Sequence, residues 1–138
     1  MDAEAPAELP YRRTFLLRRR IPSQNQFHYA HWRKYAAERD AWFLLLRAQL
    51  APRAQPPQWP VRIRLHSFRT RLLDYANLVG GAKPIPDALM RLGYLKDDSP
   101  RWFHADYHQT LVAKAEERTE LEFLLWSAGT LDEALRDR

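Results

Sequence analysis

The sequence predicts a mixed α/β domain whose elements follow the order β-α-β-α-β-β. Three observations support this prediction. Hydrophobic residues make up 46% of the 138 residues, which is enough to enclose one modest core. Residues 61–68 alternate apolar and polar side chains, as in a strand that is buried on one face. Residues 28–50 repeat apolar side chains every three or four positions, as in a helix that packs against a core.

The first half of the chain is expected to supply a tail, a strand and this helix. Residues 1–10 are rich in Ala, Glu and Pro, which predicts a flexible tail before a single domain of residues 11–138. Residues 12–20 hold three apolar side chains between arginines, which predicts a strand with a short buried centre, and 21–27 form a turn. The inward stripe of the helix is expected to consist of Trp32, Tyr35, Ala36, Phe43, Leu46 and Leu50.

The second half is expected to complete one mixed sheet with helices packed on it. Residues 102–112 and 119–126 alternate like strands, and a short helix over 86–92 precedes them. The two strands should form an antiparallel hairpin, because the link between them is too short for a crossover. Thr130, with Glu133 three residues later, predicts a capped helix at the end of the chain.

Charge is distributed unevenly along the chain. Residues 11–71 hold fourteen Arg or Lys and two acidic residues, whereas residues 72–138 hold eight basic and twelve acidic residues. A basic half beside an acidic half indicates a surface for a polyanion with acidic chemistry nearby. The alternative is a solvated basic face. The phosphates of such a polyanion are expected to contact the four arginines that precede Asp74, which are Arg62, Arg64, Arg69 and Arg71.

Several classes of protein are disfavoured by the sequence. No apolar run is long enough for a membrane span, the N-terminal residues lack a secretory pattern, and there is no cysteine. These features predict a cytoplasmic protein without a membrane partner. The stretch GGAKP lacks the residues of a phosphate-binding P-loop. His104 and His108 share one face of a predicted strand and are expected to face solvent or DNA rather than a metal.

The segment from Asp74 to Asp98 concentrates the residues that can carry chemistry. Asp74 follows the strand 61–68, and Asn77 is expected to cap a helix that follows. Gly80-Gly81 allows a sharp turn or a close approach to a ligand, and Gly93 should end the helix 86–92. The buried pair Tyr94-Leu95 is expected to anchor the next turn.

Carboxylates at both ends of this segment suggest a site for a divalent cation. A short helix that runs out and back would bring Asp97 and Asp98 close to Asp74. Carboxylates that cluster repel unless a cation or proton lies between them, and Mg²⁺ prefers carboxylate oxygens. Lys83 lies between these acids and could contact a scissile phosphate. In the alternative interpretation, the same aspartates are ordinary turn and cap residues.

The run LLDYANLVGGAKPIPDALMRLGYLKDDSP resembles the defining motif of the RusA-like endodeoxyribonucleases, which are Holliday-junction resolvases. The segment IPSQNQF resembles the Pro-Ser-x-Asn turn of that family and contributes Ser23 and Asn25. The matching positions of the longer motif are Asp74, Asn77-Leu78, Lys83, Asp87-Ala88-Leu89, Gly93 and Asp97-Asp98. The order of the elements resembles that of the family over most of the chain, whereas the specific motif covers about thirty residues.

The resemblance implies a fold, a cofactor and a role for each matched residue. Asp74 and Asp98 would be catalytic metal-binding carboxylates, Asp97 would assist at the metal, and Lys83 would be the catalytic lysine. Ser23 and Asn25 would contact DNA. The family further implies a RusA-like fold, Mg²⁺ (with Mn²⁺ as a substitute) and a homodimer of bacterial or phage origin. Its substrate would be branched DNA such as a four-way junction, cut by paired nicks in recombination and repair.

One position departs from the family motif. Ala76 stands where the motif has its second aspartate, and a methyl group cannot bind a cation. Three explanations are open: an engineered substitution, a natural loss of activity, or compensation by another acid such as Asp87 or Asp106. The sequence therefore leaves three functions: a structure-selective nuclease, a DNA-junction-binding protein of the same fold that does not cleave, and an interaction module whose basic charge is incidental.

Overall fold

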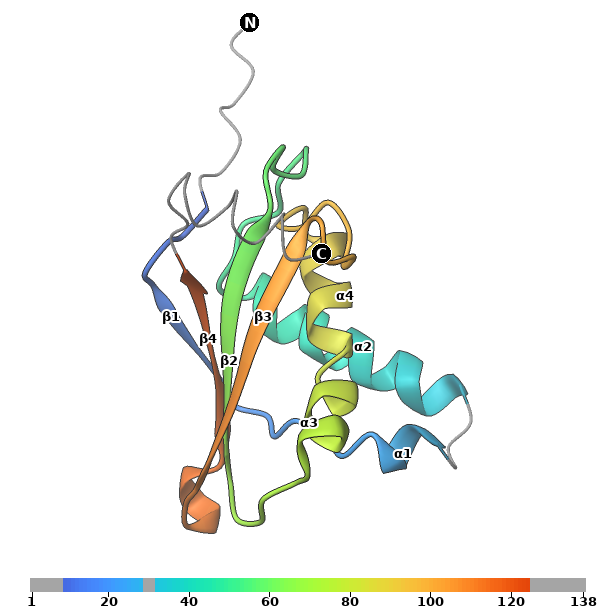
Figure 1. The fold of residues 1–138 in the computed structure, drawn as a ribbon, viewed down its shortest axis with the longest axis vertical. Coiled ribbons are helices and arrows are strands. Elements are labelled where there is room, and N and C mark those ends of the chain that lie inside the picture. The colour runs from blue at the N-terminus through green and yellow to red at the C-terminus, as the bar shows by residue number, and fades with distance from the viewer. Residues whose placement is uncertain (1–8, 29–31, 125–138) are drawn as a thin grey trace, which may run out of the picture.

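The computed structural model describes residues 9–28 and 32–124, and within them four strands form one mixed sheet. The sheet has the order β1-β4-β2-β3, and helices cover one of its faces (Figure 1). The strands are β1 (Thr14–Leu17), β2 (Val61–Arg69), β3 (Phe103–Leu111) and β4 (Arg118–Leu124). The helices are α1 (Asn25–His28), α2 (Trp32–Arg47), α3 (Tyr75–Gly81) and α4 (Pro84–Arg91), with a short 3₁₀ turn η1 (Lys114–Glu116). The mixed α/β prediction is confirmed at this level.

The predicted closing hairpin is wrong. β3 pairs with β2 in parallel, from Val61 opposite Phe103 to Arg69 opposite Leu111, and β4 pairs with the other edge of β2 in antiparallel. β3 and β4 run in opposite directions, but β2 lies between them. Strands are about 4.8 Å apart, so even a short link can pass one intervening strand. The parallel pair β2–β3 is joined by the long crossover that such a pair requires, which contains α3 and α4.

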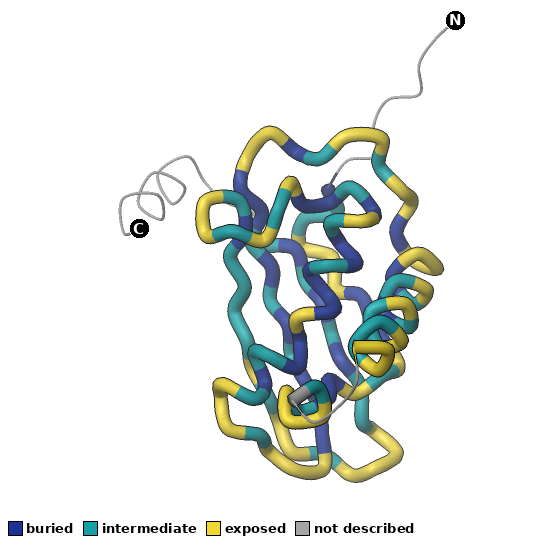
Figure 2. The backbone as a smooth tube through the Cα atoms, turned by 90° about the vertical axis from the view of Figure 1, so that its right-hand side faces the viewer, coloured by how far each residue is buried: buried dark blue, intermediate teal, exposed yellow. Residues whose placement is uncertain are grey.

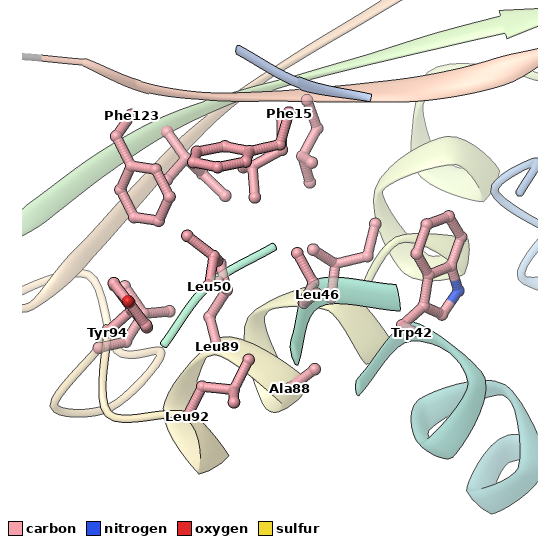
Figure 3. Packing of buried hydrophobic residues seen from close by; sticks show 14 of the residues in the cluster. Phe15, Trp42, Leu46, Leu50, Ala88, Leu89, Leu92, Tyr94 and Phe123 are labelled. Carbon is pink, nitrogen blue, oxygen red and sulfur yellow. The ribbon is translucent and has the colours of Figure 1, made fainter. Parts of the chain in front are cut away.

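The core lies between the sheet and the helices α2 and α4 (Figure 3). Every second residue of β2 is buried, and the alternation predicted for this strand is confirmed. In α2 the buried anchors are Trp42 and Leu46, whereas Trp32 is 69% exposed. The prediction that Trp32 belongs to the buried stripe of this helix is therefore wrong, and the buried tryptophan is Trp42. Trp42 lies one turn before Leu46 on the same helical face, and its indole N–H donates to Glu38, which lets it be fully buried.

Buried residues alternate with partly exposed ones along the strands (Figure 2), and in β2 the partly exposed ones form the face of the sheet away from the helices. On it Arg64 pairs with Glu122, its neighbour in register on β4, at 3.7 Å, and Arg62 pairs at 2.7 Å with Asp106, two residues along β3 from the residue opposite it. His104 and His108 belong to this outer face by the same register, opposite Arg62 and His66. Two-residue periodicity, which gives each strand one apolar and one polar face, accounts for this division.

Gly93 ends α4 as predicted, in a left-handed conformation. Its φ is 86°, and the two hydrogen bonds that follow, from Gly93 N–H to the Met90 carbonyl and from Tyr94 N–H to the Leu89 carbonyl, form a Schellman motif. Tyr94 and Leu95 are buried, as predicted for an anchor, and the Tyr94 hydroxyl donates to the Ala51 carbonyl at 2.6 Å. The two prolines of α4 lie in its first turn, where they cost no hydrogen bond, so this helix begins at Pro84 rather than residue 86.

Replacing Gly93 by Ala should lower the free energy of unfolding by at least about 1–2 kcal/mol, the cost of a left-handed non-glycine residue. The added Cβ would also overlap the Arg53 carbonyl, which raises the cost further. Urea denaturation of the variant and the parent protein would measure the difference. A loss below about 0.5 kcal/mol, the usual range for a neutral surface change, would contradict this role.

Some predicted features lie outside the described residues. These are most of the N-terminal tail, the last residues of the strand over 119–126, and the terminal helix expected from Thr130. Among the residues that the structure describes, none of the helices combines the length and apolar character needed to cross a lipid bilayer.

Candidate functional site

Asp74 forms the N-cap of α3 at the carboxyl end of β2. Its Oδ1 accepts from the Asn77 backbone N–H at 2.9 Å, and its Oδ2 accepts from the Asn77 side-chain amide at 2.7 Å. The prediction that Asn77 caps a helix is therefore wrong, because Asn77 lies inside the helix that Asp74 caps. A carboxylate has about four acceptor sites, so two sites on Asp74 remain for another ligand.

The turn that carries Asp74 is fixed to β3 by Gln109. The Gln109 side chain accepts from the Leu73 N–H at 3.0 Å and donates to the Leu73 carbonyl at 2.7 Å, as a neighbouring strand would. These two bonds hold the residue before Asp74 beside the sheet. Gln109 thus positions the exposed carboxylate at the strand end, although nothing in the sequence pattern singled it out.

Gly80 and Gly81 let α3 approach the segment that precedes α1. A Cβ at Gly81 would overlap the Pro22 carbonyl, and one at Gly80 would overlap the Gln24 side chain. The Gln24 N–H donates to the Asn77 carbonyl at 3.1 Å, which closes the contact. The glycine pair was expected to allow a sharp turn or a close approach to a ligand. In the structure it allows a close approach of α3 to the segment of the chain at Pro22 and Gln24.

These contacts enclose an open pocket of about 480 Å³ beside Asp74. Six residues that the sequence suggested for the site line it together, namely Ser23, Asn25, Arg69, Arg71, Asp74 and Asn77. Sequence reasoning missed four further lining residues, which are Arg20, Gln26, Leu72 and Leu73. The pocket combines three guanidinium groups with one carboxylate and is therefore positive overall.

Arg69 is the structural centre of this pocket. It is 4% exposed; its Nη1 donates to the Ile21 carbonyl at 2.8 Å and to Ser67 Oγ at 3.2 Å, and its Nε donates to the Arg71 carbonyl at 2.6 Å. Burial, with a smaller contribution from Arg20, lowers the pKa of the Arg69 guanidinium. The side chain ties the strand end to the segment before Ser23, so it shapes the pocket as well as charging it.

The four arginines before Asp74 separate onto two faces of the sheet. Arg69 and Arg71 line the pocket, whereas Arg62 and Arg64 lie on the outer face in the ion pairs described above. Arg62 and Arg64 therefore do not line the approach to Asp74. The reason is the parity of the strand: Arg69 shares the parity of Val61, which is buried under the helices, and the other two do not.

Lys83 lies at the elbow between α3 and α4 and contacts two carboxylates. Its Nζ donates to Asp98 Oδ2 at 3.2 Å and lies 3.6 Å from Asp87 Oδ1. The Tyr35 hydroxyl, from α2, donates to the other oxygen of Asp87. Burial lowers the pKa of Lys83, but Asp98 and Asp87 together outweigh burial and raise it, so the ammonium is charged at neutral pH.

Asp74, Asp97 and Asp98 do not gather into one group. Among the described residues no three His, Asp or Glu side chains lie close enough together to hold a metal ion. The link from β2 to α3 lies at one end of the sheet and the segment between α4 and β3 at the other (Figure 1). The helix α3, about 10 Å long at ~1.5 Å per residue, separates Asp74 from the elbow that holds Lys83 and Asp98.

Two of the aspartates fill the structural roles that the sequence left open as an alternative. Asp74 is a helix cap, and Asp97 accepts from the Ser99 N–H at 2.7 Å in the turn before β3. Hydrogen bonds from the Ser99 side chain and from its backbone N–H lower the pKa of Asp97. Asp98 is different, because it is exposed and pairs with Lys83.

Ala76 is exposed in the first turn of α3, two residues after the cap. Of the two acids that could have replaced the missing aspartate, Asp106 lies on the outer face of the sheet with Arg62, so it cannot compensate. Asp87 lies on the helical side, where it joins Tyr35 and Lys83. Within the described part of the chain, neither acid belongs to a group of three carboxylate or imidazole side chains that could hold a metal ion.

Replacing Tyr35 by Phe should lower the free energy of unfolding by about 1.5–3 kcal/mol, the usual worth of a hydrogen bond to a charged group. The lost donor leaves the half-buried Asp87 carboxylate with Lys83 alone. Tyr94→Phe is the matched control, because its hydroxyl donates to an uncharged carbonyl and should cost about 0.5–1.5 kcal/mol. Thermal unfolding of both variants gives the comparison, and equal losses would show that Asp87 does not need Tyr35.

The comparisons with known proteins assign no family. No protein-family model matches the chain, and no curated protein sequence is significantly similar to it.

Proposed function

We propose that this protein is a Mg²⁺-dependent endodeoxyribonuclease that nicks branched DNA, resembling the RusA-like resolvases. The observation that supports it concerns the stretch of chain that connects β2 to β3. This stretch places Asp74 beside a pocket that three arginines line, and it places Lys83 beside Asp98. Phosphate recognition by arginine and a charged lysine near a carboxylate are what hydrolysis of a phosphodiester needs. The proposal includes a homodimer, because two sites related by a two-fold axis suit a nearly symmetric junction.

The carboxylates fit Mg²⁺ as separate ligands rather than as a cage. Mg²⁺ is usually held by one or two carboxylates, and waters and substrate phosphates complete its shell. Asp74 has free acceptor sites, and the exposed Asp98 can exchange Lys83 for a cation. A bound cation would supply an activated water and neutralise negative charge on the phosphate.

The protein side chains would bind and orient the DNA around these carboxylates. Arg71 is exposed at the pocket rim and would hold a phosphate near Asp74, while Lys83 would offset negative charge on a different phosphate of the DNA strand. Asp87 keeps the Lys83 ammonium at the elbow when Asp98 is engaged elsewhere. In this arrangement Tyr35 holds Asp87 and has no contact with DNA.

Cleavage of a labelled four-way junction with Mg²⁺ tests the proposal. The parent protein should produce paired nicks, and Asp74→Asn and Asp98→Asn should each slow them by about 100-fold or more, the scale for losing one electrostatic catalytic group. Asp106→Asn is the matched control, since its carboxylate lies on the outer face, and it should cleave as the parent does. An equal effect of all three substitutions would show that the site lies elsewhere.

A second candidate is a protein that binds DNA junctions without cutting them. Ala76 favours it, because the exposed first turn of α3 lacks the carboxylate of the family motif. Calorimetry with Mg²⁺ or Mn²⁺ separates the two candidates. Binding of the junction without any cation binding, with or without DNA, would support the second candidate and reject the first.

A further inference from the structure

We propose that the pocket beside Asp74 binds one unpaired deoxynucleotide of the DNA branch point, with its phosphate on the arginines and its base against Leu72. This inference rests on the proposed function and names what that site recognises. A base that has left the helical stack is least costly to capture where pairing is already broken, as at a branch point. Capture would therefore select branched DNA over a plain duplex.

The size of the pocket suits a single nucleotide. Its volume of about 480 Å³ falls within the range of roughly 300–1,000 Å³ that small-molecule sites occupy, and it is far too small for a duplex. Its walls are held rigidly by the contacts of α3 with Pro22 and by the Gln109 clamp on Leu73. A preformed pocket reduces the entropy lost when a ligand is bound.

A phosphate group has a built partner in Arg69. This side chain is 4% exposed and lines the pocket, and its Nε and Nη1 are used by protein acceptors. Within the described part of the chain its Nη2 has no hydrogen-bond partner, so one edge of a buried guanidinium is left for an anion. Arg20 and Arg71 line the same pocket. Glu117 pairs with Arg20 at 3.5 Å and offsets part of its repulsion with Arg69, and a bound anion would offset the rest.

The remaining lining matches a base rather than a second phosphate. Leu72 is 50% exposed and lines the pocket with Leu73, so the pocket offers an apolar wall on which a base can pack. The amides of Asn25, Gln26 and Asn77 each offer a donor and an acceptor, the groups that pair with base edges. A phosphate-only site would have no use for either feature.

Titration of ¹⁵N-labelled protein with the four deoxynucleoside 5′-monophosphates tests the pocket without Mg²⁺ or branched DNA. Amide signals of Asn25, Leu72 and Asn77 should shift on binding, and inorganic phosphate should bind more weakly. Arg71→Ala should weaken both ligands by about tenfold or more, as for loss of a charged hydrogen bond. Leu72→Ala should weaken the mononucleotides alone, and Arg47→Ala, an exposed arginine at the end of α2, should change neither.

Three results would overturn the inference. The first is no shift at these amides with any mononucleotide. The second is inorganic phosphate binding as tightly as the mononucleotides. The third concerns 2-aminopurine placed at the branch point of a four-way junction. Its fluorescence should rise when the protein binds the junction and should not rise in a duplex, and a junction signal that does not rise would overturn the inference. A junction that stays quenched would make the pocket a site for free nucleotides. Because the titration needs no cleavage, its outcome is independent of the nuclease test.

Discussion

Replacing Ala76 by Asp is expected to raise Mg²⁺-dependent cleavage of a four-way junction by about 100-fold, since losing even an outer-shell partner of a metal ligand costs ~10–100-fold. Ala76 is exposed in the first turn of α3, so the new side chain meets no packing constraint. It would add a second carboxylate within the same turn as Asp74. A carboxylate at a helix N-terminus also stabilises the helix, by about 0.3–1 kcal/mol, so the variant should fold at least as well as the parent.

Ala76→Asn is the matched control for this gain. Asn has the shape of Asp but lacks the charge that a hard cation prefers, so it should leave cleavage near the parent level. Adding Asp74→Asn to the Ala76→Asp variant should abolish the gain. If Ala76→Asp cleaves no faster than the parent, position 76 is not a metal-binding position in this protein, and the resemblance to the nuclease motif loses its central residue.

Replacing Gly81 by Ala is expected to lower the free energy of unfolding by about 2–4 kcal/mol, as for a severe steric clash in a packed region. The added Cβ would overlap a backbone carbonyl, that of Pro22, which cannot rotate away as a side chain would. The segment that carries Ser23 and Asn25 would have to move from α3. The substitution should therefore weaken mononucleotide binding as well as stability, and urea denaturation together with the NMR titration would show both effects.

Gly80→Ala gives the contrast within the same helix. Its Cβ would overlap only the Gln24 side chain, which is exposed and can change rotamer. Alanine also favours a helix over glycine by about 1 kcal/mol, which offsets the cost. The expected net change is close to zero. Equal destabilisation by the two substitutions would contradict the assignment of the close approach to Gly81 and Pro22.

Local sequence patterns predicted the elements well because each pattern depends on near neighbours. The alternation in β2, the end of α4 at Gly93 and the buried Tyr94-Leu95 all follow from residues a few positions apart. The strand order could not be predicted in this way. Whether β4 pairs with β3 or passes beyond β2 depends on contacts between distant segments, which a short link does not decide.

The candidate site shows the same division. Of the six predicted lining residues, four come from the motifs, and Arg69 and Arg71 come from the charge distribution. The sequence could not show that Asp97 is held by Ser99 or that Asp98 pairs with Lys83. The separation of Arg62 from Arg69 follows from the sequence itself, because the parity of residues along β2 places them on opposite faces of the sheet. Tyr35 was assigned to the helical stripe as an apolar residue, although its hydroxyl requires a partner when buried.

The position of β4 between β1 and β2 has a consequence for how the protein is made. β1 comes from the start of the chain, and its sheet partner is β4, near residue 120. Because β4 follows β2 and β3 in the sequence, one edge of β2 has no hydrogen-bonded neighbour until β4 has been synthesised. Such pairing between chain ends slows folding and prolongs exposure to aggregation. The order of the strands therefore places completion of the sheet late in folding.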